Sequence, residues 1–200
     1  MKLFYSPTSP YTRKVMACAI AHEIDRQIET ILTNPYDASP QFLAANPLSK
    51  VPCLITDDGL ALFDSPVICE YLDSLDGTVP LFPRPGRGRW RALKLQALAD
   101  GIMDAGRLRR AELAQPLDAG REKVIGRQKA AVERALDELE RELPPRALDI
   151  GSISVACALG WLDHRFAAED WREGRPQLAA WYALISEHPA LARTAPPKDA

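Results

Sequence analysis

The stretch of this chain best suited to chemistry is Ser9-Pro10-Tyr11-Thr12. It follows a short apolar run at residues 2–5 and opens a helical pattern at residues 13–20. A strand, a tight turn and a helix that begins with Cys-X-X-Cys would form a thiol–disulfide exchange site. Here hydroxyl side chains stand at both sulfur positions, so the redox couple is absent. What remains is a hydroxyl at a helix N-terminus, where the helix dipole favours an anion such as the thiolate of a bound ligand.

A second candidate is Val51-Pro52, which precedes an apolar run that begins at Cys53. A trans proline at the start of a strand is the ordinary interpretation, but an X-Pro bond can also be cis. In a thioredoxin-like arrangement the loop before the third strand faces the first turn of the first helix. We therefore expect a cis bond here, which would present the backbone groups of Val51 to a peptide ligand.

Asp64-Ser65 is the third candidate, at the start of another helical pattern. Ser65 can simply cap that helix. A helix N-terminus with free N–H groups and a hydroxyl is also an anion site, and Asp64 can accept a hydrogen bond from an ammonium group. The pair would therefore suit the α-amino acid end of a ligand.

The elements that must position these residues follow from the spacing of apolar side chains and from turn signals. Ser9-Pro10, Ser39-Pro40 and Ser65-Pro66 each predict a helix start with a serine cap, and Asp58-Gly59 predicts a hairpin. The order is β-α-β-α-β-β-α, with the first half parallel and the last two strands antiparallel. Strands are expected at 3–5, 27–32, 53–56 and 60–63, and helices at 10–23, 40–45 and 66–75.

Residues 1–76 are thus expected to form a thioredoxin-like α/β domain, and residues 77–88, rich in proline and glycine, a linker. Residues 89–200 show no convincing strand and are expected to form an all-helical domain. Asp149 and Ser152 resemble a capping box with its two partners exchanged, and Gly151 beside them should lower stability slightly. The expected helices are 89–114, 119–142, 150–167 and 176–187, with residue 189 as the stop after the last.

Composition excludes several functions. The net charge of −2 argues against a nucleic-acid partner. No signal peptide precedes the first strand, and no apolar run reaches the roughly 20 residues of a membrane helix, so we expect a cytoplasmic protein. The four cysteines and three histidines show no metal-ligand spacing, and no metal is expected. The cysteines should be reduced and mostly buried. Cys53 is the exception to consider, because it directly follows Pro52 and could lie close enough to the site to be modified or to take part in catalysis.

Together, Ser9-Pro10-Tyr11-Thr12-Arg13, residues 46–52 and Asp64-Ser65 resemble the soluble glutathione transferase family, closest to bacterial members with a serine at the turn. The resemblance covers essentially the whole chain. It implies a homodimer that uses glutathione as co-substrate, with no tightly bound cofactor. It also implies that cis Val51-Pro52 pairs with the cysteinyl backbone of glutathione, that Asp64 and Ser65 hold its γ-glutamyl end, and that Lys50 lies near its glycyl carboxylate.

In this interpretation Ser9 is the catalytic hydroxyl and donates to the glutathione sulfur, with Ser6, Tyr5 and Thr12 as alternatives. The thiolate would attack a small hydrophobic or anionic electrophile, as in detoxification. Two other functions stay open: a non-catalytic interaction protein on the same fold, and a glutathione-dependent isomerase, dehalogenase or peroxidase. The electrophile-site candidates are Tyr11, Met103, Asp104 and Arg107, with Arg109 and Arg110 as neighbours that would suit an anionic substrate.

Overall fold

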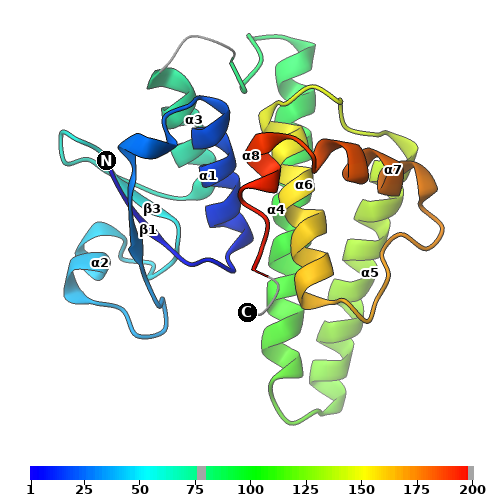
Figure 1. The fold of residues 1–200 in the computed structure, drawn as a ribbon. Coiled ribbons are helices and arrows are strands. Elements are labelled where there is room, and N and C mark those ends of the chain that lie inside the picture. Colours follow the sequence, from blue (N-terminus) through cyan, green and yellow to red (C-terminus); the bar gives the residue numbers. More distant parts are fainter. Residues whose placement is uncertain (76–79, 198–200) are drawn as a thin grey trace.

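The computed structural model describes residues 1–75 and 80–197, and these form a small sheet domain beside a helical domain (Figure 1). The sheet has four strands in the order β2-β1-β3-β4. β1 (Lys2–Tyr5) pairs in parallel with β2 (Glu29–Leu32) and antiparallel with β3 (Cys53–Ile55). β4 (Ala61–Leu62) pairs antiparallel with β3 across the Asp58-Gly59 turn, where Gly59 has a φ of 89°. The predicted thioredoxin-like order and strand directions are confirmed.

Helices cover both faces of this sheet. α1 (Pro10–Ala21) and α3 (Ser65–Leu75) pack with Leu3 in the main core, whereas α2 (Pro40–Ala45) packs on the other face. The two faces alternate along β1, as strand geometry requires: Phe4, next to Leu3, lies against Phe42 of α2 with ring centroids 5.2 Å apart. A short 3-10 helix, η1 (Asp25–Gln27), precedes β2, so that strand begins two residues later than predicted.

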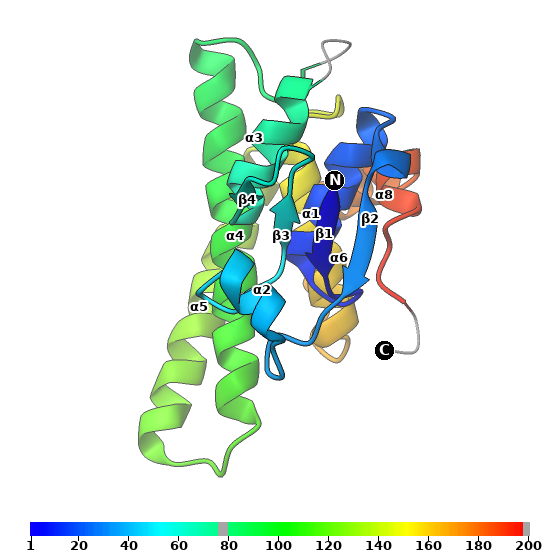
Figure 2. The same ribbon diagram turned by 90° about the vertical axis from the view of Figure 1, so that its left-hand side faces the viewer.

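The helical domain is built around α6 (Ile150–Arg165), in which every residue from 150 to 162 is buried. The long helix α4 (Arg87–Leu113) packs along α6, and α5 (Ala119–Arg141) runs antiparallel to α4. Both long helices extend past the sheet (Figure 2). α7 (Pro176–Ile185) and α8 (Pro189–Ala192) complete the domain.

Some element limits differ from the sequence prediction, most notably around the linker and at the C-terminal helix. α4 begins at Arg87, so the last two residues of the predicted 77–88 linker are helical. Residues 76–79, where the sheet domain was expected to end and the linker to begin, lie outside the described residues. The one-turn helix α8 was not predicted, because Pro189, expected as a stop, instead occupies its first position.

The start of α6 confirms the exchanged capping box. Asp149 Oδ1 accepts from the Ser152 backbone N–H at 2.7 Å, and Ser152 Oγ accepts from the Asp149 backbone N–H at 2.9 Å. Reciprocal bonds of this kind satisfy two donors that a helix start otherwise leaves unpaired. Gly151, interpreted from sequence as a cost, has a packing role here. A Cβ at this position would lie 2.8 Å from the Ala92 carbonyl oxygen of α4 and 2.8 Å from Leu95 Cβ.

We therefore expect Gly151→Ala to destabilise the protein by about 1–3 kcal/mol, despite alanine's better helix propensity, because α6 must move away from α4. Gly126→Ala in α5 is the matched control, since nothing lies within 4 Å of its added Cβ. That substitution should stabilise the protein by about 0.5–1 kcal/mol. Urea unfolding of both variants measures the two effects, and equal shifts would contradict the packing role of Gly151.

Candidate functional site

Ser9 lies at the N-cap of α1, at the centre of the predicted site. Its Oγ accepts from the Thr12 backbone N–H at 3.3 Å, and its own N–H donates to the Ser6 carbonyl at 3.1 Å. A hydroxyl that accepts one bond can still donate its hydrogen. Ser9 is half-buried, so its hydroxyl can be reached at the start of the helix. The alternatives Tyr5, Ser6 and Thr12 line a separate cavity that does not include Ser9.

The Val51–Pro52 peptide bond is cis, as predicted. The loop before it is held by Asn46, a buried residue to which the sequence assigned no role. Asn46 Nδ2 donates to the Lys50 carbonyl at 2.7 Å, and its Oδ1 accepts from the Leu48 N–H at 3.0 Å. The side chain of Lys50 is exposed at the end of this loop.

The start of α3 corrects one prediction. Ser65 does not cap the helix: its Oγ is buried and has no hydrogen-bond partner among the described residues. Asp64 precedes the helix, and its carbonyl accepts from the Ile68 N–H at 3.0 Å. The carboxylate of Asp64 is exposed beside this helix start. The unpartnered hydroxyl and the first N–H groups of α3 can therefore serve a bound carboxylate.

The electrophile-site candidates are brought together only in part. Tyr11 Oη donates to Asp104 Oδ1 at 2.5 Å, which joins α1 to α4. Burial, and then this bond to Asp104, raise the pKa of Tyr11, so the phenol stays protonated. Arg107 is exposed one turn further along α4, and its positive charge opposes the rise in the pKa of Tyr11. Met103 was a wrong prediction, because its side chain is 0 % exposed and belongs to the core.

A buried ion pair lies next to these residues and was not predicted. Lys14 of α1 is 0 % exposed, and its Nζ donates to both carboxylate oxygens of Asp100, at 2.6 and 2.9 Å. Burial raises the pKa of Asp100, Lys14 opposes that rise, and the charges of Asp64 and Asp104 add to it. Asp64 and Asp104 are thus each near enough to Asp100 to repel its carboxylate. A region of this charge suits an ammonium group.

All four cysteines are free and buried, as expected. Burial raises the pKa of the Cys53 thiol to about 11, so the thiolate form is disfavoured. This argues against a catalytic role for Cys53, because the thiolate is the reactive form. The described residues contain no cluster of His, Cys, Asp and Glu fit for a metal ion. None of their helices is both long and apolar enough to span a membrane.

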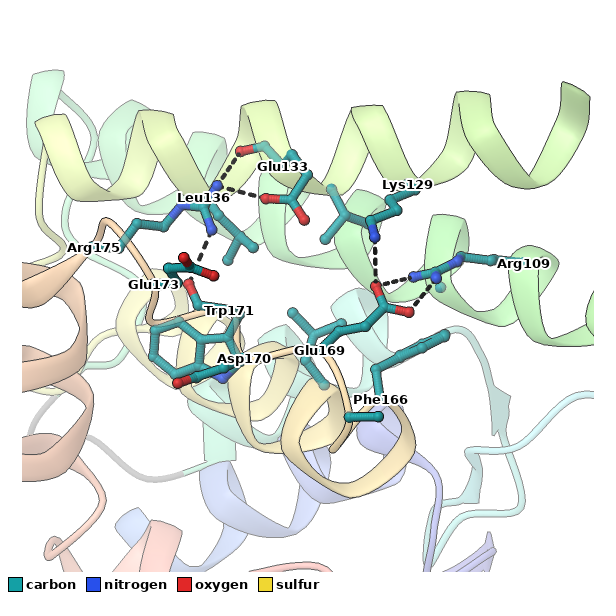
Figure 3. Close-up of a pocket in the computed structure, with 14 residues that line it drawn as sticks. Arg109, Lys129, Glu133, Leu136, Phe166, Glu169, Asp170, Trp171, Glu173 and Arg175 are labelled. Atoms are coloured by element: carbon teal, nitrogen blue, oxygen red, sulfur yellow. Dashed lines mark hydrogen bonds and ion pairs between the residues drawn. The ribbon is translucent and has the colours of Figure 1, made fainter.

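A cavity of about 390 Å³ lies elsewhere, between α4, α5 and the segment that joins α6 to α7 (Figure 3). Each of the three cations in its lining is paired with a carboxylate. Arg109 Nη1 lies 3.0 Å from Glu169 Oε2, Lys129 lies 3.3 Å from the same carboxylate, and Arg175 lies 2.6 Å from Glu133. These pairs anchor the connecting segment onto α4 and α5. Arg109, predicted as part of an anionic-substrate surface, is therefore buried and engaged away from Tyr11.

Comparisons with known proteins agree with this geometry. The family model "Glutathione S-transferase, N-terminal domain" matches residues 8–75, and "Glutathione S-transferase, C-terminal domain" matches residues 109–184. A relative in Escherichia coli (strain K12), the uncharacterized GST-like protein YibF, is 37% identical over 203 residues that cover 99% of this chain and 100% of its own.

Solved structures agree over nearly the full length. A glutathione transferase family member from Pseudomonas fluorescens Pf-5, crystallised with bound glutathione, has a TM-score of 0.90 and 43% identity, covering 98% of each chain. A glutathione S-transferase from Methylobacillus flagellatus KT with glutathione bound has a TM-score of 0.88 and 35% identity, covering 98% of this chain and 99% of its own. The cis Val51–Pro52 bond and the open start of α3 stand in the domain that the first of the two family models describes. With both domains matched, this chain belongs to the glutathione transferase family.

Proposed function

We propose that the protein is a glutathione transferase that activates the glutathione thiolate for attack on a small electrophile. The observation that carries the proposal is the start of α3, where the buried Ser65 hydroxyl lacks a partner beside the exposed Asp64 carboxylate. Ser65 would receive the γ-glutamyl carboxylate and Asp64 the ammonium group. The backbone of Val51, beside cis Pro52, would pair with the cysteinyl residue, and Lys50 would meet the glycyl carboxylate. The two relatives crystallised with glutathione support glutathione as the ligand.

Thiolate activation is assigned to Ser9. The thiol of free cysteine has a pKa of about 8.5, and lowering it by about two units requires roughly 2.7 kcal/mol of preference for the thiolate. A hydrogen bond to a charged group supplies about 1.5–3 kcal/mol, and a helix N-terminus about 0.3–1 kcal/mol more. Ser9 would donate its hydrogen without ionising. The hydrogen bond from Ser9 and the N-terminus of α1 can therefore together supply the free energy that thiolate activation requires.

The electrophile would lie between α1 and α4, against Tyr11, Asp104 and Arg107. The hydroxyl of protonated Tyr11 already donates to Asp104, so its ring would form an apolar wall of the site. Arg107 supplies an exposed cation that would favour an anionic electrophile. The substrate class is thus a small hydrophobic or anionic electrophile. Because the cysteines are free, a reducing compartment, the cytoplasm, is the proposed location.

A homodimer is proposed as well, with its contact where α3 meets α4. Val67 is 45% and Trp90 69% exposed, and Arg89 Nη2 donates to Glu70 Oε1 at 2.6 Å between them. A second copy of the chain would cover this apolar surface. Sedimentation equilibrium should find a dimer for the wild type and a monomer for Trp90→Glu. A monomeric wild type would remove this part of the proposal.

Ser65→Ala should weaken glutathione binding about tenfold, because the γ-glutamyl carboxylate loses one charge-assisted hydrogen bond. The free energy of unfolding should stay the same or rise slightly, since the variant removes an unsatisfied buried hydroxyl. Calorimetric titration and urea unfolding measure the two quantities. Ser74→Ala, at the exposed far end of the same helix, is the control and should change neither. A Ser65→Ala variant that is less stable but binds normally would assign Ser65 to the fold alone.

The experiment that tests the function follows thiolate ultraviolet absorbance against pH with glutathione bound to the wild-type protein. A pKa of the bound thiol about two units below that of free glutathione supports the transferase. Binding without any depression of that pKa excludes thiolate activation. If no glutathione binds at about millimolar concentration, which corresponds to a very weak affinity, the non-catalytic interaction protein becomes the favoured function. Isolation of its partners is then the next experiment.

A further inference from the structure

A second cavity, of about 400 Å³, lies on the far side of α1 from Tyr11. The end of β1, the face of α1 that carries Thr12, Arg13 and Met16, and the tail at residues 193–197 form its walls. Tyr11 and Lys14, which contact α4, lie on the opposite face, because successive helical residues are rotated by about 100°. The cavity therefore lies across α1 from the proposed electrophile site, and its lining includes none of the residues proposed to bind glutathione.

Arg13 brings a buried charge to this cavity without a carboxylate to balance it. The residue is 7% exposed, and its Nη1 and Nη2 donate to the backbone carbonyls of Ala156 at 3.4 Å and Leu191 at 3.3 Å. No described carboxylate lies within 4.0 Å of it, and its Nε has no hydrogen-bond partner among the described residues. A buried charge is ordinarily paired, so an uncompensated guanidinium points to an anion.

Two threonines line the cavity beside Arg13. Thr12, 3% exposed, has a hydroxyl without a partner among the described residues. Thr194 Oγ1 donates to the same Leu191 carbonyl as Arg13, at 3.3 Å, so the guanidinium lies beside the tail wall. Asp25 is the acidic residue of the lining, and Arg193 neutralises it at 2.6 Å. The lining keeps one positive charge, in contrast to the cavity of Figure 3, where arginines and carboxylates pair.

The remaining surface is mostly apolar, with Tyr5, Met16 and Ile20 half-buried along it. We propose that this cavity binds a small organic carboxylate with an apolar body, its carboxylate at Arg13 and Thr12. The Arg13 guanidinium supplies the charge and the Thr12 hydroxyl a second donor. The proposal does not depend on the proposed transferase function, because no group of the glutathione site takes part.

The probe is hydrocinnamate, a phenyl ring on a two-carbon chain that ends in a carboxylate, and its neutral amide is the comparison. Isothermal titration of the full chain should show submillimolar binding of hydrocinnamate. The amide should bind about tenfold to a hundredfold more weakly, since it loses the charge. Binding should persist with glutathione present at saturation. Displacement of hydrocinnamate by glutathione would overturn the separate site, whereas failure of glutathione to bind at all would concern only the proposed function.

Three variants test the residues. Arg13→Met keeps the side-chain length and should abolish the preference for the carboxylate over the amide. Thr12→Val, nearly equal in shape, should weaken hydrocinnamate about tenfold. Ala195→Trp should fill the cavity from the exposed tail and block both probes. Leu184→Trp, an exposed position of α7 outside the cavity, is the control and should bind normally.

Circular dichroism melting identifies any variant that does not fold. If Arg13→Met fails to fold, Thr12→Val and Ala195→Trp decide the question. No heat of binding at about 10 mM hydrocinnamate, far weaker than the expected affinity, overturns the proposal. Undiminished binding to folded Thr12→Val and Ala195→Trp does so too, as does equal affinity for the acid and the amide.

Discussion

Replacing Ser9 with alanine should lower kcat/KM for glutathione conjugation about tenfold to a hundredfold, which corresponds to one charge-assisted hydrogen bond of about 1.5–3 kcal/mol. Glutathione binding should change little, because Asp64, Ser65 and Val51 would still hold the peptide. The pKa of the bound thiol should rise toward its value in solution. Initial rates against pH measure both effects, since the variant should recover activity as the pH approaches the thiol's ordinary pKa.

Ser9 also caps α1, so its loss has a structural cost that must be separated from catalysis. An N-cap serine contributes about 0.5–2 kcal/mol to stability. The chain offers a matched control in Ser39, which precedes a proline in the same way and accepts from the Phe42 N–H at 3.2 Å. Ser39→Ala should lose similar stability and keep full activity. Equal losses of activity in the two variants would mean that Ser9 serves only the fold.

Replacing Lys14 with methionine should destabilise the protein by about 3–5 kcal/mol, the usual result of leaving one partner of a buried ion pair alone. Lys14 is 0 % exposed, and its amine contacts both oxygens of Asp100. Burial, which Lys14 opposes, already raises the pKa of Asp100. Without the lysine that pKa should rise further. The folded variant then binds a proton that the unfolded chain releases, so its stability falls as pH rises, and the loss should shrink in acid.

Urea unfolding of three variants tests this. The double variant Lys14→Met, Asp100→Leu should regain most of the loss, because neither charge is left buried. Lys94→Met removes the exposed lysine that pairs with Glu138 at 3.0 Å, and should cost no more than about 1 kcal/mol. A Lys14→Met variant as stable as Lys94→Met would show that the buried pair contributes little.

Much of the fold could be predicted because its signals are local. Ser9-Pro10 and Ser39-Pro40 mark helix starts by side-chain chemistry that does not depend on the rest of the molecule, and both caps form. The hairpin at Asp58-Gly59 follows from the positive φ that glycine allows. A long helix can be recognised from the periodic spacing of its apolar residues. α8 spans a single turn and is too short to show such a period.

The rest depended on contacts between distant segments. Lys14 on a helix resembles a solvated lysine until Asp100 is placed opposite it, and Met103 resembles a site residue until the fold buries it completely. Ser65 has the same Ser-Pro sequence as the two capping serines. Its hydroxyl nonetheless stays free, because the helix begins at Ser65 itself, one residue earlier than in the other two. Only the folded structure distinguishes a capping serine from an available one.

The Lys14–Asp100 pair and the Arg13 bonds to Ala156 and Leu191 have a consequence for protein engineering. A chimera that joins this sheet domain to another helical domain would leave the cation on α1 unpaired wherever the incoming α4 lacks a carboxylate at the position of Asp100. Such grafts should fail to fold unless residues 14 and 100 are transferred together. Residues 14 and 100 are therefore a pair that any exchange of domains has to keep, although they lie on opposite sides of the linker.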